Sequence, residues 1–279
     1  AALNYELVFR QEPQDFSGTD IQSYFTEYAI QETIRGLQEH RGYSEALARQ
    51  MVSSGGISIY TTMEPHAQEA LDATYQKKEL FSADPSNHID LPEQPEGGTV
   101  IINNQTGAIA AMQGGFGDKR GNLVTNRATD IRRSPGSTLK PLAIYAPAIE
   151  LGIASGATII RDEESYLNPD NPSMIWPTNS YGYYRGDMTL RNSLKISNNV
   201  PAAKLLYEVG VENSKYYLKR VGIDLDNDPV GMAIAVGTLT DGLSPLQVAS
   251  AFTVFPNGGL YSEPYAVKQV LDNRNNVLF

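Results

Sequence analysis

Apolar residues in the first third of the chain recur at spacings typical of helices and strands. Over 21–37 and again over 45–52 they fall three and four positions apart, and Gly55 follows the second stretch. Residues at this spacing share one helix face and glycine commonly ends a helix, so the pattern predicts two helices. Alternation over 57–63 predicts a short strand, and the proline that opens 65–80 favours a third helix there.

The pattern breaks at residues 82–98, which contain three prolines and two glycines. Proline and glycine at this density predict a linker and a domain boundary. The runs 99–103 and 108–112 that follow are apolar and are separated by Asn-Gln-Thr-Gly. Two short apolar runs around such a turn sequence predict a β-hairpin.

Most of the remaining chain has a helical pattern, from about residue 135 to 255. The exception is 161–188, rich in Pro, Asn, Tyr and Gly, which predicts a loop, and 267–271 predicts a final strand. These elements indicate an α+β fold in which the hairpin and the C-terminal strands form an antiparallel sheet covered by helices, beside a mostly helical lobe. We expect a small α/β linker domain over 1–97 and the N-terminal portion of a second domain over 98–279.

Composition narrows the function classes. The 279 residues carry 32 Asp and Glu against 22 Lys and Arg, a formal charge of -10, which argues against nucleic-acid binding because phosphate contacts require a basic surface. Cysteine is absent, so disulfides, thiol catalysis and cysteine-ligated metals are excluded. The three histidines lack metal-ligand spacing, and we therefore expect neither a metal nor a cofactor.

The two ends of the chain bear on its extent. No apolar run approaches the roughly 20 residues that span a bilayer. The chain begins in a polar, irregular stretch and ends on the strand-like Asn-Val-Leu-Phe. We therefore expect a fragment of a longer protein whose membrane anchor lies outside these residues.

The candidate chemistry centres on Ser137 and Lys140. Three positions apart on a helix, the two side chains share one face. Serine becomes a strong nucleophile when a base removes its proton, and lysine is such a base when burial lowers its pKa. Lys140 is the only charged residue between Thr138 and Ile149, which predicts an internal helix. The same spacing also arises by chance about once in a chain of this length, with the serine as an N-cap and the lysine in solvent.

A second motif, Ser197-Asn198-Asn199, lies 60 residues further on and is the only Ser-x-Asn in the chain. The Ser197 hydroxyl can relay a proton, and the Asn199 amide can bind a substrate carbonyl. Taken by itself, an asparagine two residues before Pro201 is more typical of a helix N-cap. The presence of both motifs in one chain shifts that balance towards chemistry.

Both motifs and several other stretches resemble the penicillin-binding transpeptidases, most closely the transpeptidase domain of the bifunctional (class A) members. The resemblance covers most of the chain. It rests on residues 56–65, 106–115, 126–128, 135–141, 197–202, 237–238, 244–246 and 257–259. It implies a penicillin-binding/serine β-lactamase-like fold, incomplete in this chain.

The resemblance also implies a role for each motif residue. Ser137 is the acylated nucleophile, and its backbone N–H is half of the oxyanion hole. Lys140 is the general base, Ser197 passes the proton towards the leaving amine, and Asn199 hydrogen-bonds the substrate amide. The implied substrate is the D-Ala-D-Ala end of a peptidoglycan stem peptide, whose acyl group passes to an acceptor amine. β-Lactams mimic that end and acylate the same serine.

The sequence departs from the family in one respect. The Lys-Thr/Ser-Gly motif, which supplies the rest of the oxyanion hole and binds the substrate carboxylate, is absent from all 279 residues. We expect a second chain to carry it, with the C-terminal part of the domain. The glycosyltransferase domain of class A proteins is also expected outside this chain. We expect the protein to act at the extracytoplasmic face of the bacterial cell membrane.

Two questions stay open at this point. Trp176 and Tyr181, within 161–188, either line a groove for the peptide or pin the loop by ring packing.

The same scaffold also supports a DD-carboxypeptidase, a serine β-lactamase or a non-catalytic β-lactam sensor. Hydrolysis requires a positioned water and a base, and no carboxylate near either motif is an obvious candidate. The intact motif residues argue against a dead site.

Overall fold

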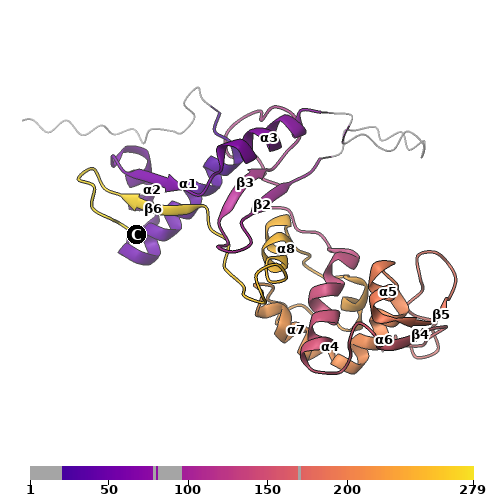
Figure 1. Cartoon of the computed structure of the whole chain (residues 1–279). Helices are drawn as coiled ribbons and strands as arrows, with labels where there is room; N and C mark the ends of the chain where they lie inside the picture. Colours follow the sequence, from indigo (N-terminus) through magenta and orange to yellow (C-terminus); the bar gives the residue numbers. More distant parts are fainter. Residues whose placement is uncertain (1–20, 78–79, 81–95, 169–170) are drawn as a thin grey trace, which may run out of the picture. The chain divides into compact units, whose positions relative to one another are not determined.

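The structure is a computed structural model, and it describes residues 21–77, 80, 96–168 and 171–279. The chain forms two compact units (Figure 1). Of the described residues, the first unit comprises those up to 97, 108–126 and 265–279, and the second comprises those in 98–107 and 127–264. The expected division into a linker domain over 1–97 and a second domain over 98–279 stays a prediction, and in the structure 108–126 and 265–279 belong to the first unit. Most of the predicted linker lies outside the described residues.

The first unit combines helices with short strands. Its elements are α1 (Tyr24–Arg41), α2 (Glu45–Ser54), β1 (Ser58–Thr61), α3 (Pro65–Tyr75), β3 (Ile109–Gln113) and β6 (Val267–Leu271). A serine caps the N-terminus of each of the first two helices, Ser23 for α1 and Ser44 for α2. Its hydroxyl accepts a hydrogen bond from a backbone N–H that has no partner within the helix. Strand β1 pairs antiparallel with β6, with Ser58 opposite Leu271.

The helices and strands predicted for this unit all form, with two differences. Helix α3 ends at Tyr75 rather than near residue 80. The C-terminal strand β6 was expected in the sheet of the predicted hairpin, and it pairs with β1 instead. Short apolar runs identify both segments as strands, but their pattern does not specify which strand pairs with which.

The second unit is mostly helical and contains both candidate motifs. Its elements are β2 (Thr99–Ile102), η3 (Gly136–Leu139), η4 (Pro141–Tyr145), α4 (Ala146–Glu150), β4 (Ile159–Asp162), β5 (Gly186–Thr189), α5 (Leu190–Lys195), α6 (Asn199–Val209), α7 (Val211–Lys219), η5 (Met232–Val236) and α8 (Pro245–Phe252). Strands β4 and β5 pair antiparallel, with Ile159 opposite Thr189. The sequence pattern predicted a loop here and missed both strands, which lie at the two ends of that stretch.

Residues 136–150 form one helical run whose turn type changes twice. It starts as a 3-10 helix (η3), continues as a π-helix (η4) and ends as the α-helix α4. Pro141 has no N–H to donate to the carbonyl of Ser137, as an α-helix would require. The N–H of Lys140 bonds that carbonyl instead, in a tighter turn. The run packs against α6 and α7 in the main hydrophobic core, as its apolar composition predicted (Figure 1).

Candidate active site

Lys140 is the centre of the candidate site. Its side chain is fully buried, with 0% of its surface exposed. Its Nζ donates to the carbonyl of Ser197 at 2.8 Å, to the carbonyl of Asn198 at 3.3 Å and to Oδ1 of Asn199 at 2.6 Å. The hydroxyl oxygen of Ser197 lies 3.4 Å from the same nitrogen. The lysine therefore joins the two sequence motifs into one cluster.

Burial also changes the acid–base behaviour of this lysine. Desolvation lowers the pKa of Lys140 from 10.5 to about 8. The groups that accept its hydrogen bonds carry no charge, so nothing there compensates for the buried ammonium as a carboxylate would. With this pKa, roughly one lysine in ten is neutral at pH 7 and able to accept a proton.

Ser137 lies one turn before Lys140, on the exposed side of η3. Among the residues that the structure describes, its hydroxyl has no hydrogen-bond partner. Backbone N–H groups at the start of a helix lack partners within it and favour negative charge nearby. An exposed hydroxyl in this position is accessible to a substrate carbonyl.

The turn that carries Ser137 is held from behind by residues 237–243. Gly136 donates its N–H to the carbonyl of Gly237 at 3.1 Å, and the Ser134 hydroxyl both donates to and accepts from the backbone of Leu239. A Cβ at Gly237 would lie 1.7 Å from the carbonyl oxygen of Gly136. Only glycine permits this approach.

Ser197 and Asn199 flank the turn between α5 and α6. Ser197 is exposed and adopts φ 57°, a left-handed conformation that costs a non-glycine residue about 1–3 kcal/mol and is common at functional sites. The N-cap interpretation of Asn199 is wrong: Asn198 caps α6, accepting from the N–H of Val200 at 3.2 Å. The amide of Asn199 is therefore free to bond Lys140 through Oδ1 and the carbonyl of Thr178 through Nδ2, the latter at 2.8 Å.

Trp176 and Tyr181 both have internal contacts. Trp176 packs against the main core and exchanges backbone hydrogen bonds with the 165–167 stretch. The Tyr181 hydroxyl donates to Asp162 at 3.4 Å, and its ring lies 4.7 Å from that of Tyr183, with the guanidinium of Arg185 above both rings. Burial, followed by the charge of Asp162, raises the pKa of Tyr181. These contacts hold the loop against the rest of the unit by ring packing. A role for either ring in substrate binding stays a prediction.

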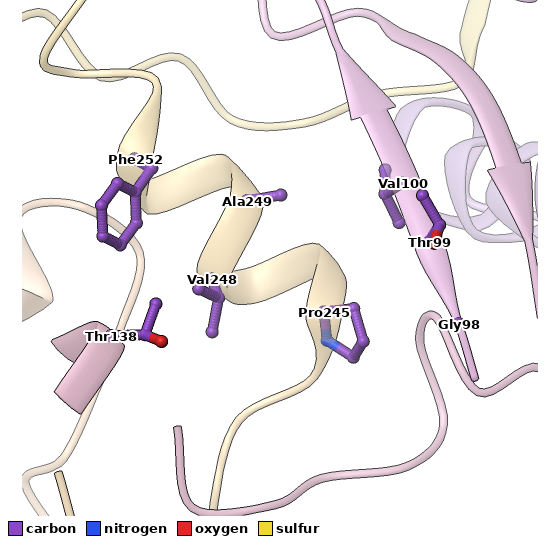
Figure 2. Close-up of a pocket in the computed structure, with 8 residues that line it drawn as sticks. All are labelled: Gly98, Thr99, Val100, Thr138, Pro245, Val248, Ala249 and Phe252. Atoms are coloured by element: carbon purple, nitrogen blue, oxygen red, sulfur yellow. The ribbon is translucent and has the colours of Figure 1, made fainter. Parts of the chain in front are cut away.

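A pocket of about 400 Å³ lies beside the turn of Ser137 (Figure 2). Its lining comes from β2, from α8 and from Thr138, the residue after the candidate nucleophile. Most of the lining is apolar, with Val100, Val248 and Phe252 among its side chains. Neither Lys140 nor the second motif lines it, so the cluster around the lysine is a separate feature.

Two features are absent from the part of the chain that the structure describes. There, no group of three or more His, Cys, Asp or Glu side chains is arranged to hold a metal ion. No helix within the same residues has both the length and the apolar character required to cross a membrane.

Comparison with known proteins gives concordant matches. The model of the penicillin binding protein transpeptidase domain matches residues 97–277. Penicillin-binding protein 1F of Bacillus subtilis (strain 168) is 34% identical over 228 residues, which is 81% of this chain and 29% of that protein. The chain spans about a third of the length of the curated relatives it matches, between 29 and 39% for five of them.

Solved structures match as well. Penicillin-binding protein 1A from Haemophilus influenzae has a TM-score of 0.71 and 21% identity, over 93% of this chain and 50% of that one. PonA1 from Mycobacterium tuberculosis in complex with penicillin V has a TM-score of 0.69 and 20% identity, over 91% and 64%. At these identities the solved structures bear on the fold alone, and they confirm the α+β transpeptidase fold that the sequence predicted.

Proposed function

Because the chain belongs to the penicillin-binding protein transpeptidase family, we propose that it provides the acylating residues of a serine D-Ala-D-Ala transpeptidase. The observation that carries the proposal is the buried Lys140, whose lowered pKa suits a general base and whose nitrogen contacts both Ser197 and Asn199. The substrate is a peptidoglycan stem peptide, and the second substrate is the amine of a neighbouring strand.

In the proposed first half-reaction, neutral Lys140 takes the proton of Ser137 while the hydroxyl oxygen attacks the carbonyl carbon of the penultimate D-Ala. The negative charge that forms on the carbonyl oxygen is stabilised by the backbone N–H of Ser137. The peptide bond then breaks, the terminal D-Ala leaves, and its amine receives the proton from Lys140 by way of Ser197. The products are an acyl ester on Ser137 and free D-Ala.

In the second half-reaction, an acceptor amine attacks the ester carbon. The new peptide bond forms, and the Ser137 oxygen leaves and recovers its proton through the same lysine. A β-lactam enters the first half-reaction in the same way, but its leaving nitrogen stays tethered to the acyl group. The structure of PonA1 in complex with penicillin V supports extending β-lactam binding to this chain.

The site requires groups that this chain does not carry. We infer that a second polypeptide supplies the Lys-Thr/Ser-Gly strand, since the motif is missing from the 279 residues. We further propose a glycosyltransferase domain elsewhere in the natural protein and a location at the extracytoplasmic face of the bacterial cell membrane. Residues 98–279 are then the N-terminal portion of the transpeptidase domain, and Trp176 and Tyr181 line its peptide groove.

Intact-mass spectrometry of the purified protein, with and without penicillin, tests the proposal. We expect one adduct per chain, mapped by peptide digestion to Ser137, and a second polypeptide in the same spectrum. Ser137→Ala is expected to abolish the adduct, whereas Ser155→Ala, at an exposed serine far from the motifs in sequence, is the matched control. An adduct that persists in Ser137→Ala would contradict the assignment. Rapid release of hydrolysed penicillin would indicate a β-lactamase instead.

A further inference from the structure

Two buried polar side chains behind the second motif have no part in the chemistry proposed above. Asp162, at the end of β4, is 1% exposed, and Asn179, between β4 and β5, is 6% exposed. Nδ2 of Asn179 lies 2.9 and 3.2 Å from the two carboxylate oxygens of Asp162 and 3.1 Å from the carbonyl of Tyr183. The backbone N–H of Arg185 donates to the same carboxylate at 2.9 Å. These donors satisfy a buried carboxylate that forms no salt bridge with any residue the structure describes.

The carboxylate determines which way the Asn179 amide points. A carboxylate only accepts hydrogen bonds, so Nδ2 must face Asp162 and Oδ1 must face the other side. There Oδ1 accepts from the backbone N–H of Asn199 at 3.2 Å and of Val200 at 3.4 Å. These are the first two residues of α6, whose N–H groups have no partner within the helix. Asn179 therefore holds the start of the helix that carries the second motif.

The preceding residue orients the Asn199 side chain. Nδ2 of Asn199 donates to the carbonyl of Thr178 at 2.8 Å, so its Oδ1 is the atom that meets Nζ of Lys140. A reversed amide would place its NH₂ group against the ammonium, which cannot accept, and its oxygen against the carbonyl of Thr178, which cannot donate. The loop at 178–179 thus holds both the backbone and the side chain of Asn199.

We propose that Asp162 and Asn179 are positioning residues for the acyl transfer, acting through Asn199. The inference rests on the proposed function, because it concerns the geometry of the same site. Neither side chain contacts Ser137 or Lys140. The pair holds Asn199 so that its amide oxygen accepts from the lysine and its second amide N–H stays available to a substrate carbonyl.

The principal variant is Asn179→Leu, which removes both amide groups without changing the charge. We expect the second-order rate constant for penicillin acylation to fall about ten- to a hundredfold, because misplacing a reacting group by an ångström has effects of this order. We also expect the pH midpoint of acylation to move lower. The ammonium of Lys140 then loses an acceptor, while the remaining groups within hydrogen-bond distance, all on residues 197–198, stay uncharged.

A charge exchange guards against a variant that merely misfolds. Asn179→Asp alone places two carboxylates together and should slow acylation at least as strongly. The double variant Asp162→Asn with Asn179→Asp exchanges the two groups. The amide is then at 162 and donates to the carboxylate at 179, so the hydrogen bond between the two positions is restored in the reverse direction. That carboxylate still accepts from the N–H groups of Asn199 and Val200. We expect the double variant to acylate within about threefold of the unaltered protein.

Ser165→Ala is the control for general loosening of the same loop. Ser165 is 6% exposed and donates to the carbonyl of Glu163 at 2.8 Å, and among the described residues it forms no hydrogen bond with α6. We expect its pH midpoint to be unchanged even if its melting temperature falls. Equal rates and equal midpoints for Asn179→Leu and Ser165→Ala would overturn the positioning role.

A second readout separates this inference from the proposed function. NMR titration of protein labelled with ¹³C-lysine, with the Lys140 signal assigned by its loss in Lys140→Met, needs no acylation. We expect the Lys140 midpoint to be lower in Asn179→Leu than in the unaltered protein. If the unaltered protein, together with the polypeptide that carries the Lys-Thr/Ser-Gly strand, is not acylated by penicillin, the proposed function fails. If it is acylated and the midpoint is the same in both proteins, the positioning role alone fails.

Discussion

Lys140 and Lys219, both in the second unit, differ in burial and in the charge of their hydrogen-bond partners. Lys140 is fully buried, its hydrogen-bond partners are uncharged, and burial lowers its pKa to about 8. Lys219, at the end of α7, has half its side chain exposed and pairs with Asp224 at 3.1 Å and with Asp226. Hydrogen bonds to Asp226 and Asp224 raise the pKa of Lys219.

The difference shows that the surroundings decide what a lysine can do. A paired surface ammonium keeps its proton and contributes little beyond solubility. A buried ammonium without a carboxylate is destabilised, so it gives up its proton near neutral pH and can act as a base. The sequence indicates this contrast, because Lys140 lies in an apolar stretch and Lys219 precedes an acidic one.

Removing the buried amine is expected to have the largest effect. Lys140→Met keeps the length and apolar character of the side chain, and we expect the acylation rate constant to fall about a hundred- to ten-thousandfold because the general base is lost. Lys140→Arg should be equally inactive, since a guanidinium does not deprotonate in this pH range. Stopped-flow measurement with a fluorescent penicillin gives the rates. Activity of Lys140→Arg near that of the unaltered protein would exclude the base role.

Disturbing the turn behind the buried lysine is expected to be costly as well. Gly237→Ala places a methyl group against the carbonyl of Gly136 at a positive φ of 72°, and we expect a loss of about 2–5 kcal/mol in the free energy of unfolding. Gly152→Ala has a similar φ of 69° with open space around it, so about 1–2 kcal/mol is expected. Urea unfolding measures both. Equal losses would show that the Gly136 contact is unimportant.

The two lysines should make opposite contributions to the pH dependence of the free energy of unfolding. The pKa of Lys140 is lower in the folded state, about 8 against 10.5, so between these values the unfolded chain binds more protons and stability rises with pH. Relative to Lys140→Met, the unaltered protein should gain about 3 kcal/mol over this range. The raised pKa of Lys219 predicts that its contribution is lost at alkaline pH. Urea unfolding at pH 8 and pH 10 checks the sign for each variant, and a stability difference that falls with pH for Lys140 would contradict the account.

The smallest effect is expected from the surface pair. Lys219→Met should leave the acylation rate within twofold of the unaltered protein, because the residue has no contact with either motif. Any change in melting temperature should disappear in 1 M salt, which screens exposed charges. A change in acylation rate of tenfold would mean that α7 transmits effects to the site.

The fold was predictable where a pattern is local. The strand over 267–271 and the helix beginning at Pro65 form as expected, because alternation and an N-terminal proline are local signals. The pairing of β6 with β1 joins residues about 200 positions apart, and the local pattern carries no information about it. Strands β4 and β5 escaped prediction because the stretch between them is rich in Pro, Asn and Tyr, a composition more typical of a loop.

The site shows the same division. Ser137, Lys140, Ser197 and Asn199 were recognisable from two motifs, and the structure brings the last three together. Their catalytic roles stay proposals. Taken by itself, the second motif favoured an N-cap at Asn199, because a bond to Lys140 that spans 59 residues leaves no local signal; Asn198 caps the helix instead.

Asp162 and Asn179 were missed altogether. Polar residues in a Pro- and Asn-rich stretch are usually solvated, and only the three-dimensional structure places these two inside the unit. No motif in the sequence marks them, since each has its partners from other parts of the chain. Their burial and hydrogen bonds are the observations that single them out.

The central claim is that burial makes Lys140 the base that activates Ser137. The most direct test is the second-order rate constant for penicillin acylation of the purified protein from pH 5.5 to pH 10. The account predicts a rate that rises with pH to a plateau, with a midpoint near 8, the pKa of the buried lysine. A rate that is independent of pH across this range, or one that falls as the lysine loses its proton, would contradict it.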